Sequence, residues 1–137
     1  MFSHKHLCKL AGFSNTEAFS VMQSKRQLLR TGVYMGNCRF YGLSDGARAI
    51  LFRRLRDLDI REAIAATMID RLPLGALEDA TEALSSGKAA RLVVTFTRGD
   101  EGITGAVNAA PERSGTTLTL DLTGDFLAAL ETKELTA

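Results

Sequence analysis

The sequence is poor in the residues from which many catalytic and metal sites are built. It holds only two histidines, His4 and His6, and only two cysteines, Cys8 and Cys38, among 137 residues. A Ser–His–Asp triad needs a histidine between a nucleophile and an acid, and with both histidines beside the N-terminus no such set can be assembled. Two cysteines do not make a disulfide framework, so we expect both to be reduced thiols.

Long apolar runs and export signals are also missing. No apolar run approaches the roughly 18 residues that a membrane-spanning helix requires. The N-terminal segment MFSHKHLCKL lacks the apolar core and the cleavage site of a signal peptide. We therefore expect a cytoplasmic protein that does not enter a membrane.

Two short motifs that could bind a metal or a phosphate lack the required spacing. His4, His6 and Cys8 form H-x-H-x-C, which is not the spacing of a zinc finger or of a catalytic zinc site. The glycines within residues 99–105 do not form G-x-G-x-x-G, and they join two predicted strands instead of opening a helix. We predict no metal, no cofactor and no enzymatic activity.

Charge is divided unequally along the chain, although the net charge is only +1. Residues 1–72 hold twelve Lys and Arg against six Asp and Glu, whereas residues 73–137 hold five against ten. A basic half favours a nucleic acid or another polyanion as partner, and the acidic half a protein, a ligand or a second copy of the chain. Pro73 disfavours helix at the residue before it and marks a predicted boundary between two domains, 1–72 and 73–137.

An amphipathic helix is predicted within residues 41–64, YGLSDGARAILFRRLRDLDIREAI. Ser44 or Asp45 stands where an N-cap is expected. The apolar residues recur at helical spacing and are Ala47, Ile50, Leu51, Leu55 and Leu58. The arginines lie opposite or beside this apolar stripe and are Arg48, Arg53, Arg54 and Arg56. By itself such a face is most simply solvated, but the preceding segments make it a candidate for binding phosphates.

Two helices joined by a tight turn are predicted before this segment. Residues 4–11 form the first, and Gly12 permits the turn because glycine adopts positive φ readily. Ser14 is a candidate N-cap for the second helix, residues 15–30, with Glu17 completing a capping box. The arrangement resembles a helix-turn-helix, which needs a small residue, a turn glycine and apolar residues at fixed spacings. Here these positions are Cys8, Gly12, Phe13, Ala18 and Val21.

A short hairpin is predicted directly after the second helix. Gly32 is the expected C-cap of that helix. Residues 33–35 and 38–41 form the two strands, because Gly36-Asn37 is a favourable two-residue turn. Such a hairpin would be a wing, from which Arg39 reaches phosphate or the minor groove.

Together these segments are similar to the MerR class of winged-helix regulators. The similarity covers residues 5–70 and is best over 39–64, where Arg-Phe-Tyr ends the wing, Ser-Asp opens the next helix and ILFRRLRDLDI continues it. Residues 19–27 differ from the family, because they are longer and lack its Arg-aromatic pair. MerR-type metal sensors keep their thiols beyond the DNA-binding half, so the absence of cysteine after Cys38 argues against metal sensing.

The second half is predicted to be a small sheet with helices. A helix over residues 76–86 is followed by strands over 91–97, 103–109 and 116–122. A last helix over 126–131, capped by Thr123 or Asp125, precedes a fraying tail. The predicted fold class is α+β, with an N-terminal winged helix-turn-helix and a C-terminal β-sheet and helix region. This layout is similar to phage and prophage regulators of the MerR-like type.

The resemblance implies a sequence-specific, DNA-binding transcriptional regulator that acts as a homodimer on double-stranded DNA. The residues expected to face bases are Asn15, Thr16, Ser20 and Gln23. Those expected to contact phosphates are Lys25, Arg26, Arg30, Arg39, Arg48, Arg53 and Arg56. The acidic region 73–137 would supply the dimer contact, or a site for an effector or RNA polymerase. The alternative is a phage-type protein-interaction module, an inhibitor or adaptor without specific DNA binding.

Overall fold

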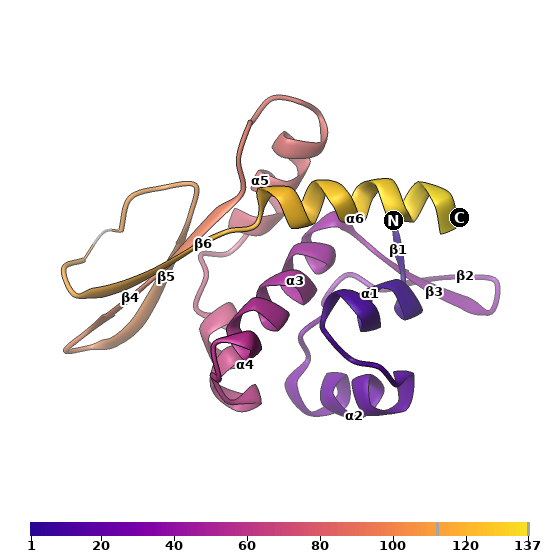
Figure 1. Ribbon diagram of the computed structural model, residues 1–137, viewed down its shortest axis with the longest axis horizontal. Helices are drawn as coiled ribbons and strands as arrows, with labels where there is room; N and C mark the ends of the chain where they lie inside the picture. Colours follow the sequence, from indigo (N-terminus) through magenta and orange to yellow (C-terminus); the bar gives the residue numbers. More distant parts are fainter. Residues whose placement is uncertain (112, 137) are drawn as a thin grey trace.

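Six helices and two antiparallel three-stranded sheets make up the described part of the chain (Figure 1). The computed structural model describes residues 1–111 and 113–136, with side chains as far as Thr132. The first half contains β1 (Phe2–Ser3), α1 (His4–Leu10), α2 (Thr16–Arg26), β2 (Val33–Met35), β3 (Cys38–Tyr41), α3 (Leu43–Asp57) and α4 (Glu62–Asp70). The second half contains α5 (Ala76–Ser85), β4 (Val93–Gly99), β5 (Gly102–Val107), β6 (Thr116–Asp121) and α6 (Thr123–Thr136). The predicted α+β class is confirmed.

The two sheets lie in different parts of the molecule. The first has the order β1-β3-β2, and its hairpin turns at Gly36 and Asn37 as predicted. Strand β1 was not predicted; it pairs Phe2 with Tyr41 and so ties the N-terminus to the hairpin. The second sheet has the order β5-β4-β6 and extends away from the helices at one end of the molecule (Figure 1).

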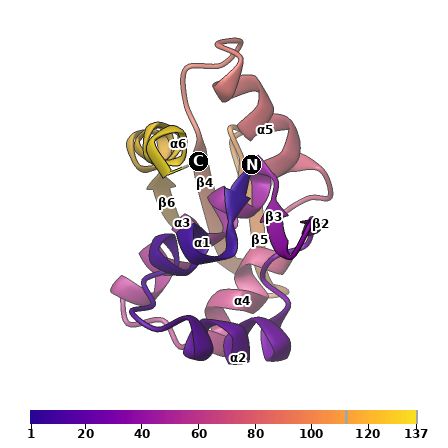
Figure 2. The same ribbon diagram turned by 90° about the vertical axis from the view of Figure 1, so that its right-hand side faces the viewer.

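Helix α3 lies at the centre, between helices from both halves of the chain (Figures 1 and 2). All of its predicted apolar residues are buried except Leu58, which is exposed beyond its C-terminal end. Helices α1 and α4 pack against it from the first half, and α5 and α6 from the second. One continuous cluster of buried side chains extends from Phe2 to Ala129, so the predicted parts share a core.

Two helices begin at positions that differ from the prediction. The N-cap of α2 is Asn15 and not Ser14, because the Asn15 side chain accepts hydrogen bonds from two backbone N–H groups of the first turn. Helix α3 begins after Gly42, so Ser44 and Asp45 lie inside the helix and do not cap it. Both are buried. Because the Asp45 carboxylate does not cap the helix, it can accept hydrogen bonds from other segments that pack around it.

Helix α2 is shorter than predicted. It ends at Arg26, and Gln27 follows with φ 51°, in the left-handed conformation that closes a helix. Residues 28–32 therefore lie outside the helix, and Gly32 is not its C-cap. Leu28 and Leu29 are nevertheless buried, because the segment after the helix folds back onto the core.

Helix α2 also turns a different face to the core than predicted. Phe19 and Met22 are fully buried, whereas Val21 is 56% exposed and Ala18 is exposed too. Phe19 reaches inward against Phe13, with ring centres 5.4 Å apart. A large aromatic side chain buries more apolar area than alanine or valine, so its packing sets the rotation of the helix. The expected roles of Ala18 and Val21 as inward residues are thus wrong.

The second half follows the predicted order with shifted ends. Strand β4 begins two residues later than expected, at Val93, and β5 ends at Val107. Helix α6 starts at Thr123 and continues to Thr136, beyond the predicted end at 131 and through the tail expected to fray; residue 137 lies outside the described residues. The Asp121 carboxylate accepts a hydrogen bond from the Thr123 N–H at this start. In the described residues, no helix combines the length and the apolar character that a membrane crossing requires.

Candidate nucleic-acid interface

A hollow lies between α2 and the hairpin of β2 and β3. Three parts of the chain line it, namely the start of α1, the middle of α2 and the hairpin. The residues that line it are His4, Ser20, Gln23, Ser24, Tyr34, Arg39 and Tyr41. Polar residues of the second helix and the Arg39 guanidinium therefore border the same surface.

Arg39 is held by two tyrosine rings on the hairpin. Its guanidinium carbon lies 5.6 Å from the ring centre of Tyr34 and 5.3 Å from that of Tyr41. These distances are typical of cation–π contacts, in which the ring face attracts the positive charge. A side chain at Gly32 would collide with the guanidinium, so glycine leaves the space that Arg39 occupies. The two rings thus fix the position of the guanidinium on the hairpin, and Tyr34 itself is 69% exposed.

His4 joins α1 to both walls of the hollow. Its Nε2 lies 3.2 Å from Ser20 Oγ, and its Nδ1 lies 3.4 Å from the Tyr41 hydroxyl oxygen. Burial, and secondly the positive charge of Arg39, lower the pKa of His4 below its usual value. Burial also raises the pKa of Tyr41, which stays a neutral hydroxyl. Near neutral pH the hollow thus has one positive charge, at Arg39, beside uncharged polar groups.

The four residues expected to face bases have different surroundings. Asn15 accepts bonds from the helix it caps, and the Gln23 side chain both donates to and accepts from the backbone of Leu29. Ser20 is exposed beside His4, and Thr16 is exposed at the start of the helix. Thr16 and Ser20 are therefore free to reach a ligand without loss of a structural contact to the backbone, whereas Asn15 and Gln23 shape the helix and its exit.

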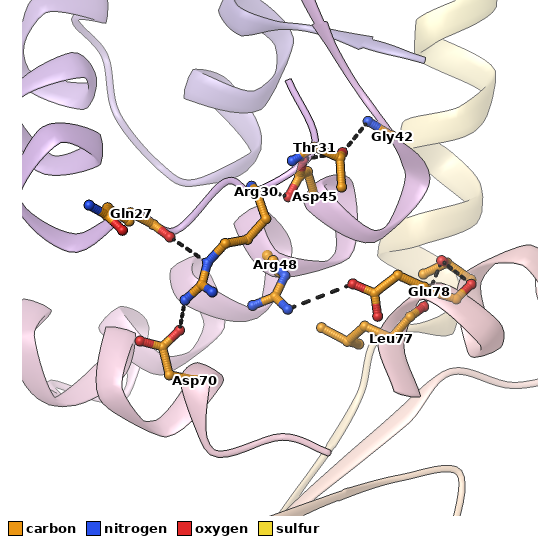
Figure 3. A network of polar contacts seen from close by, with 10 residues as sticks. Gln27, Arg30, Thr31, Gly42, Asp45, Arg48, Asp70, Leu77 and Glu78 are labelled. Carbon is orange, nitrogen blue, oxygen red and sulfur yellow. Dashed lines mark hydrogen bonds and ion pairs between the residues drawn. The ribbon is translucent and has the colours of Figure 1, made fainter. Parts of the chain in front are cut away.

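Arg26 and Arg30, at the end of α2, are paired with carboxylates of α4. The Arg26 Nε donates to Glu62 over 3.2 Å. The Arg30 guanidinium donates to Asp70 over 2.5 Å and to the Gln27 carbonyl oxygen over 2.9 Å (Figure 3). Both pairs are partly exposed, so a phosphate could reach these arginines only in competition with a carboxylate already in place.

Asp45 holds the connection between α2 and the hairpin. Its carboxylate is completely buried and accepts hydrogen bonds from the Arg30 N–H, the Thr31 N–H and the Thr31 hydroxyl (Figure 3). Thr31 Oγ1 in turn accepts from the Gly42 N–H over 3.0 Å. These bonds fix the segment that sets the position of the hairpin relative to α2, a role that differs from the N-cap predicted at Ser44 or Asp45.

The arginines of α3 do not form one continuous basic face. The Arg48 side chain is only 13% exposed and points toward Glu78 of α5, with 3.8 Å between the charged atoms (Figure 3). Arg53 is exposed and lies 4.0 Å from Asp57, and Arg56 donates to the Ile60 carbonyl oxygen. Burial makes Arg48 the least accessible of the residues expected to bind phosphate.

Lys25 differs from Arg26 and Arg30, its neighbours near the end of α2, which are paired with carboxylates. It is exposed on α2, and among the described side chains no carboxylate lies within 4.0 Å of it. Arg54, outside the predicted set, is engaged by Asp125 of α6 at 3.2 Å. Within residues 1–111 and 113–132, no three His, Cys, Asp or Glu side chains are grouped so that they could hold a metal ion.

No family model, curated protein or solved structure is significantly similar to this chain. The function is therefore inferred from the geometry of the hollow and from the charges around it.

Sequence reasoning missed His4, Tyr34 and Tyr41 as residues of this site. The hairpin register could have indicated Tyr34, because a two-residue turn places it directly opposite Arg39. His4 and Tyr41 come together only through the pairing of β1 with β3, and a two-residue strand gives no detectable pattern.

Proposed function

We propose that this chain is a DNA-binding transcriptional regulator with a winged helix-turn-helix of MerR-like type. The observation that carries the proposal is the hollow in which exposed residues of α2 and the hairpin Arg39 border one surface. A helix that enters the major groove and a wing that contacts the flanking DNA backbone must lie on the same side of the protein. The basic character of residues 1–72 supports the same partner.

The surroundings of each residue refine the expected contacts. Thr16 and Ser20 are the candidates for base contacts, while Lys25 and Arg39 are the candidates for phosphate contacts. Arg26 and Arg30 would bind phosphate by exchanging a carboxylate of α4 for it, which lowers their net contribution. The proposed interface is therefore centred on α2 and the hairpin, with Arg48 outside it.

We also propose that the regulator acts as a homodimer. A single winged module buries little surface on DNA, and operators with two-fold symmetry match two-fold symmetric proteins. Region 73–137 would provide the contact between copies, or a surface for a protein such as RNA polymerase. Its excess of acidic residues fits a role away from the phosphate backbone.

Gel retardation tests the DNA-binding function. The purified chain is mixed with a fragment that carries its own upstream region, at two salt concentrations and with random DNA as competitor. We expect a discrete complex that survives the competitor and weakens steeply with salt, because phosphate binding releases counterions. No retardation at low salt would contradict the proposal, and retardation that any DNA removes equally would leave only a basic surface.

A second candidate function is a protein-interaction module, an inhibitor or adaptor. One face of the hairpin favours it: Val33 and Met35 are 55% and 56% exposed, and their partners across the strands are Phe40 and Cys38. This uncharged face is opposite to that of Tyr34 and Arg39, because side chains alternate along a strand. An adaptor would retard no specific DNA and would co-purify with a protein in defined proportion.

A further inference from the structure

We propose that a second hollow, between α1, α3 and α6, binds a small organic carboxylate with an apolar body. The hollow has a volume of about 460 Å³, within the range of natural small-molecule sites. It lies where a helix of the second half meets two helices of the first half. None of its lining residues belongs to the hollow that contains Arg39.

The floor of the hollow supplies apolar contact. Leu10 of α1, Ile50 of α3 and Ala129 of α6 contribute side chains without polar atoms. Ala128 also lines it and is exposed, so the α6 wall is made by small residues that leave room for a ligand. An alkyl or aryl group of a ligand would be stabilised by covering this surface, because apolar area is removed from water.

The rim of the hollow favours a negative head group. Among the described residues, Lys9, Arg53 and Arg54 contribute three positive charges, and Asp57 and Asp125 contribute two negative charges. Arg54 is paired with Asp125 at 3.2 Å, and Arg53 is paired more loosely with Asp57 at 4.0 Å. Lys9 is exposed and has no described carboxylate within 4.0 Å. A ligand carboxylate between Lys9 and Arg53 would give Lys9 an ion pair and would share Arg53 with the exposed Asp57.

The same hollow is connected to the turn between α1 and α2. A Cβ atom built on Gly12 would lie 3.4 Å from Cγ of Arg53, so the stem of this arginine lies beside the turn. A ligand that draws the guanidinium into the hollow would change this arrangement. Resting on the proposed function, we infer that ligand occupancy alters DNA affinity through Arg53 and Gly12.

The binding test uses the full chain and two six-carbon probes whose head groups carry opposite charges. Hexanoate and hexylamine are titrated separately at millimolar concentration while backbone amide shifts are recorded by NMR. We expect hexanoate to give saturable shifts at α1, α3 and α6 around the hollow, and hexylamine to give none there. Equal effects of the two probes, or no saturable shift with hexanoate, would overturn the proposal.

Matched variants locate the site. A128F fills the hollow and should abolish the hexanoate shifts, whereas L127F adds an aromatic ring to the same helix outside the hollow and should keep them. K9Q removes one rim charge and should weaken binding about threefold, while K5Q on the same helix should not. Hexanoate affinity unchanged in both A128F and K9Q would refute the assignment. Melting curves of all four variants verify that they fold.

A DNA arm separates the two claims. Gel retardation is repeated with hexanoate at saturation, on the native chain and on A128F. A change in DNA affinity that A128F removes supports the coupling through the turn, and an unchanged affinity overturns that coupling. Because the NMR titration needs no DNA, a failure of the proposed DNA-binding function leaves the ligand test intact.

Discussion

The buried carboxylate of Asp45 accepts two hydrogen bonds from Thr31, one from the backbone N–H at 2.9 Å and one from the hydroxyl at 2.5 Å. Asp45 belongs to the central helix α3, and Thr31 lies in the connection between α2 and the hairpin. The pair therefore determines where the hairpin stands relative to α2.

Replacement of Asp45 by alanine is expected to destabilise the protein strongly. The substitution leaves three donors without their acceptor, and we expect a loss of about 3 kcal/mol in the free energy of unfolding. Urea denaturation measures it. D57A, which removes an exposed carboxylate from the same helix, is the control and should change stability by less than about 0.5 kcal/mol. Equal midpoints for the two variants would show that the Asp45 bonds do not support the fold.

Arg39 is expected to bind phosphate with a guanidinium whose position is fixed by Tyr34 and Tyr41. R39A should weaken binding to all DNA sequences about equally and flatten the salt dependence by about one unit. R39K keeps the charge and hence the salt dependence, but it loses the planar group that stacks on tyrosine. Its DNA affinity should therefore lie between that of the native protein and that of R39A. Fluorescence anisotropy at several salt concentrations measures both quantities. K88A, in the second half, is the control; if R39A behaves like it, Arg39 is not a phosphate contact.

The lowered pKa of His4 predicts a loss of stability in mild acid. Since the folded state holds this group less readily protonated than the unfolded state, whose pKa is near 6.5, the unfolded state takes up more protons as the pH falls. Stability therefore falls with decreasing pH from just above 6.5 down to the lowered pKa of the folded state. H4Q should remove this part of the pH dependence, measured as urea midpoints across that range. Both the native protein and H4Q contain His6, so the difference between their pH dependences is due to His4. Parallel curves of urea midpoint against pH for the two proteins would contradict the prediction.

Gly46 is expected to tolerate no side chain. A Cβ at this position of α3 would collide with the ring of Phe2, which is itself completely buried. G46A should therefore cost about 1–3 kcal/mol through overpacking, despite the higher helix propensity of alanine. The matched control is G124A in α6, where a Cβ would meet nothing within 4 Å. We expect G124A to be neutral or stabilising in thermal unfolding, and a comparable loss in both variants would argue against the Phe2 contact.

Local pattern was sufficient for the hairpin and for most of α3. Gly36 and Asn37 dictate a tight turn, and the predicted apolar stripe of α3 is buried as far as Leu55. The burial of Ala49 and Phe52 outside this stripe was not indicated by the spacing, because it results from the central position of the helix. The rotation of α2 was not predictable in this way, because Val21 and Phe19 offered competing apolar faces. Packing of Phe19 against Phe13 decided between them, and that contact depends on the turn between the helices.

The partners of the arginines were also beyond local reasoning. Arg26 meets Glu62 and Arg30 meets Asp70, pairs that are 36 and 40 residues apart in sequence. Helical spacing by itself indicates only pairs within one helix, such as Arg53 with Asp57. A basic segment counted from sequence can thus present fewer accessible charges than its composition implies.

The central position of α3 limits how this protein can be modified by recombination. Leu77 and Phe126 are buried in the same core as residues of the first half, although both follow Pro73, where a domain boundary is predicted. A chimera that joins residues 1–72 to an unrelated partner would expose the apolar surface that these side chains cover. For the proposed DNA-binding function, specificity is therefore expected to be changed by grafting the surface of α2 and the hairpin, and not by exchanging whole halves.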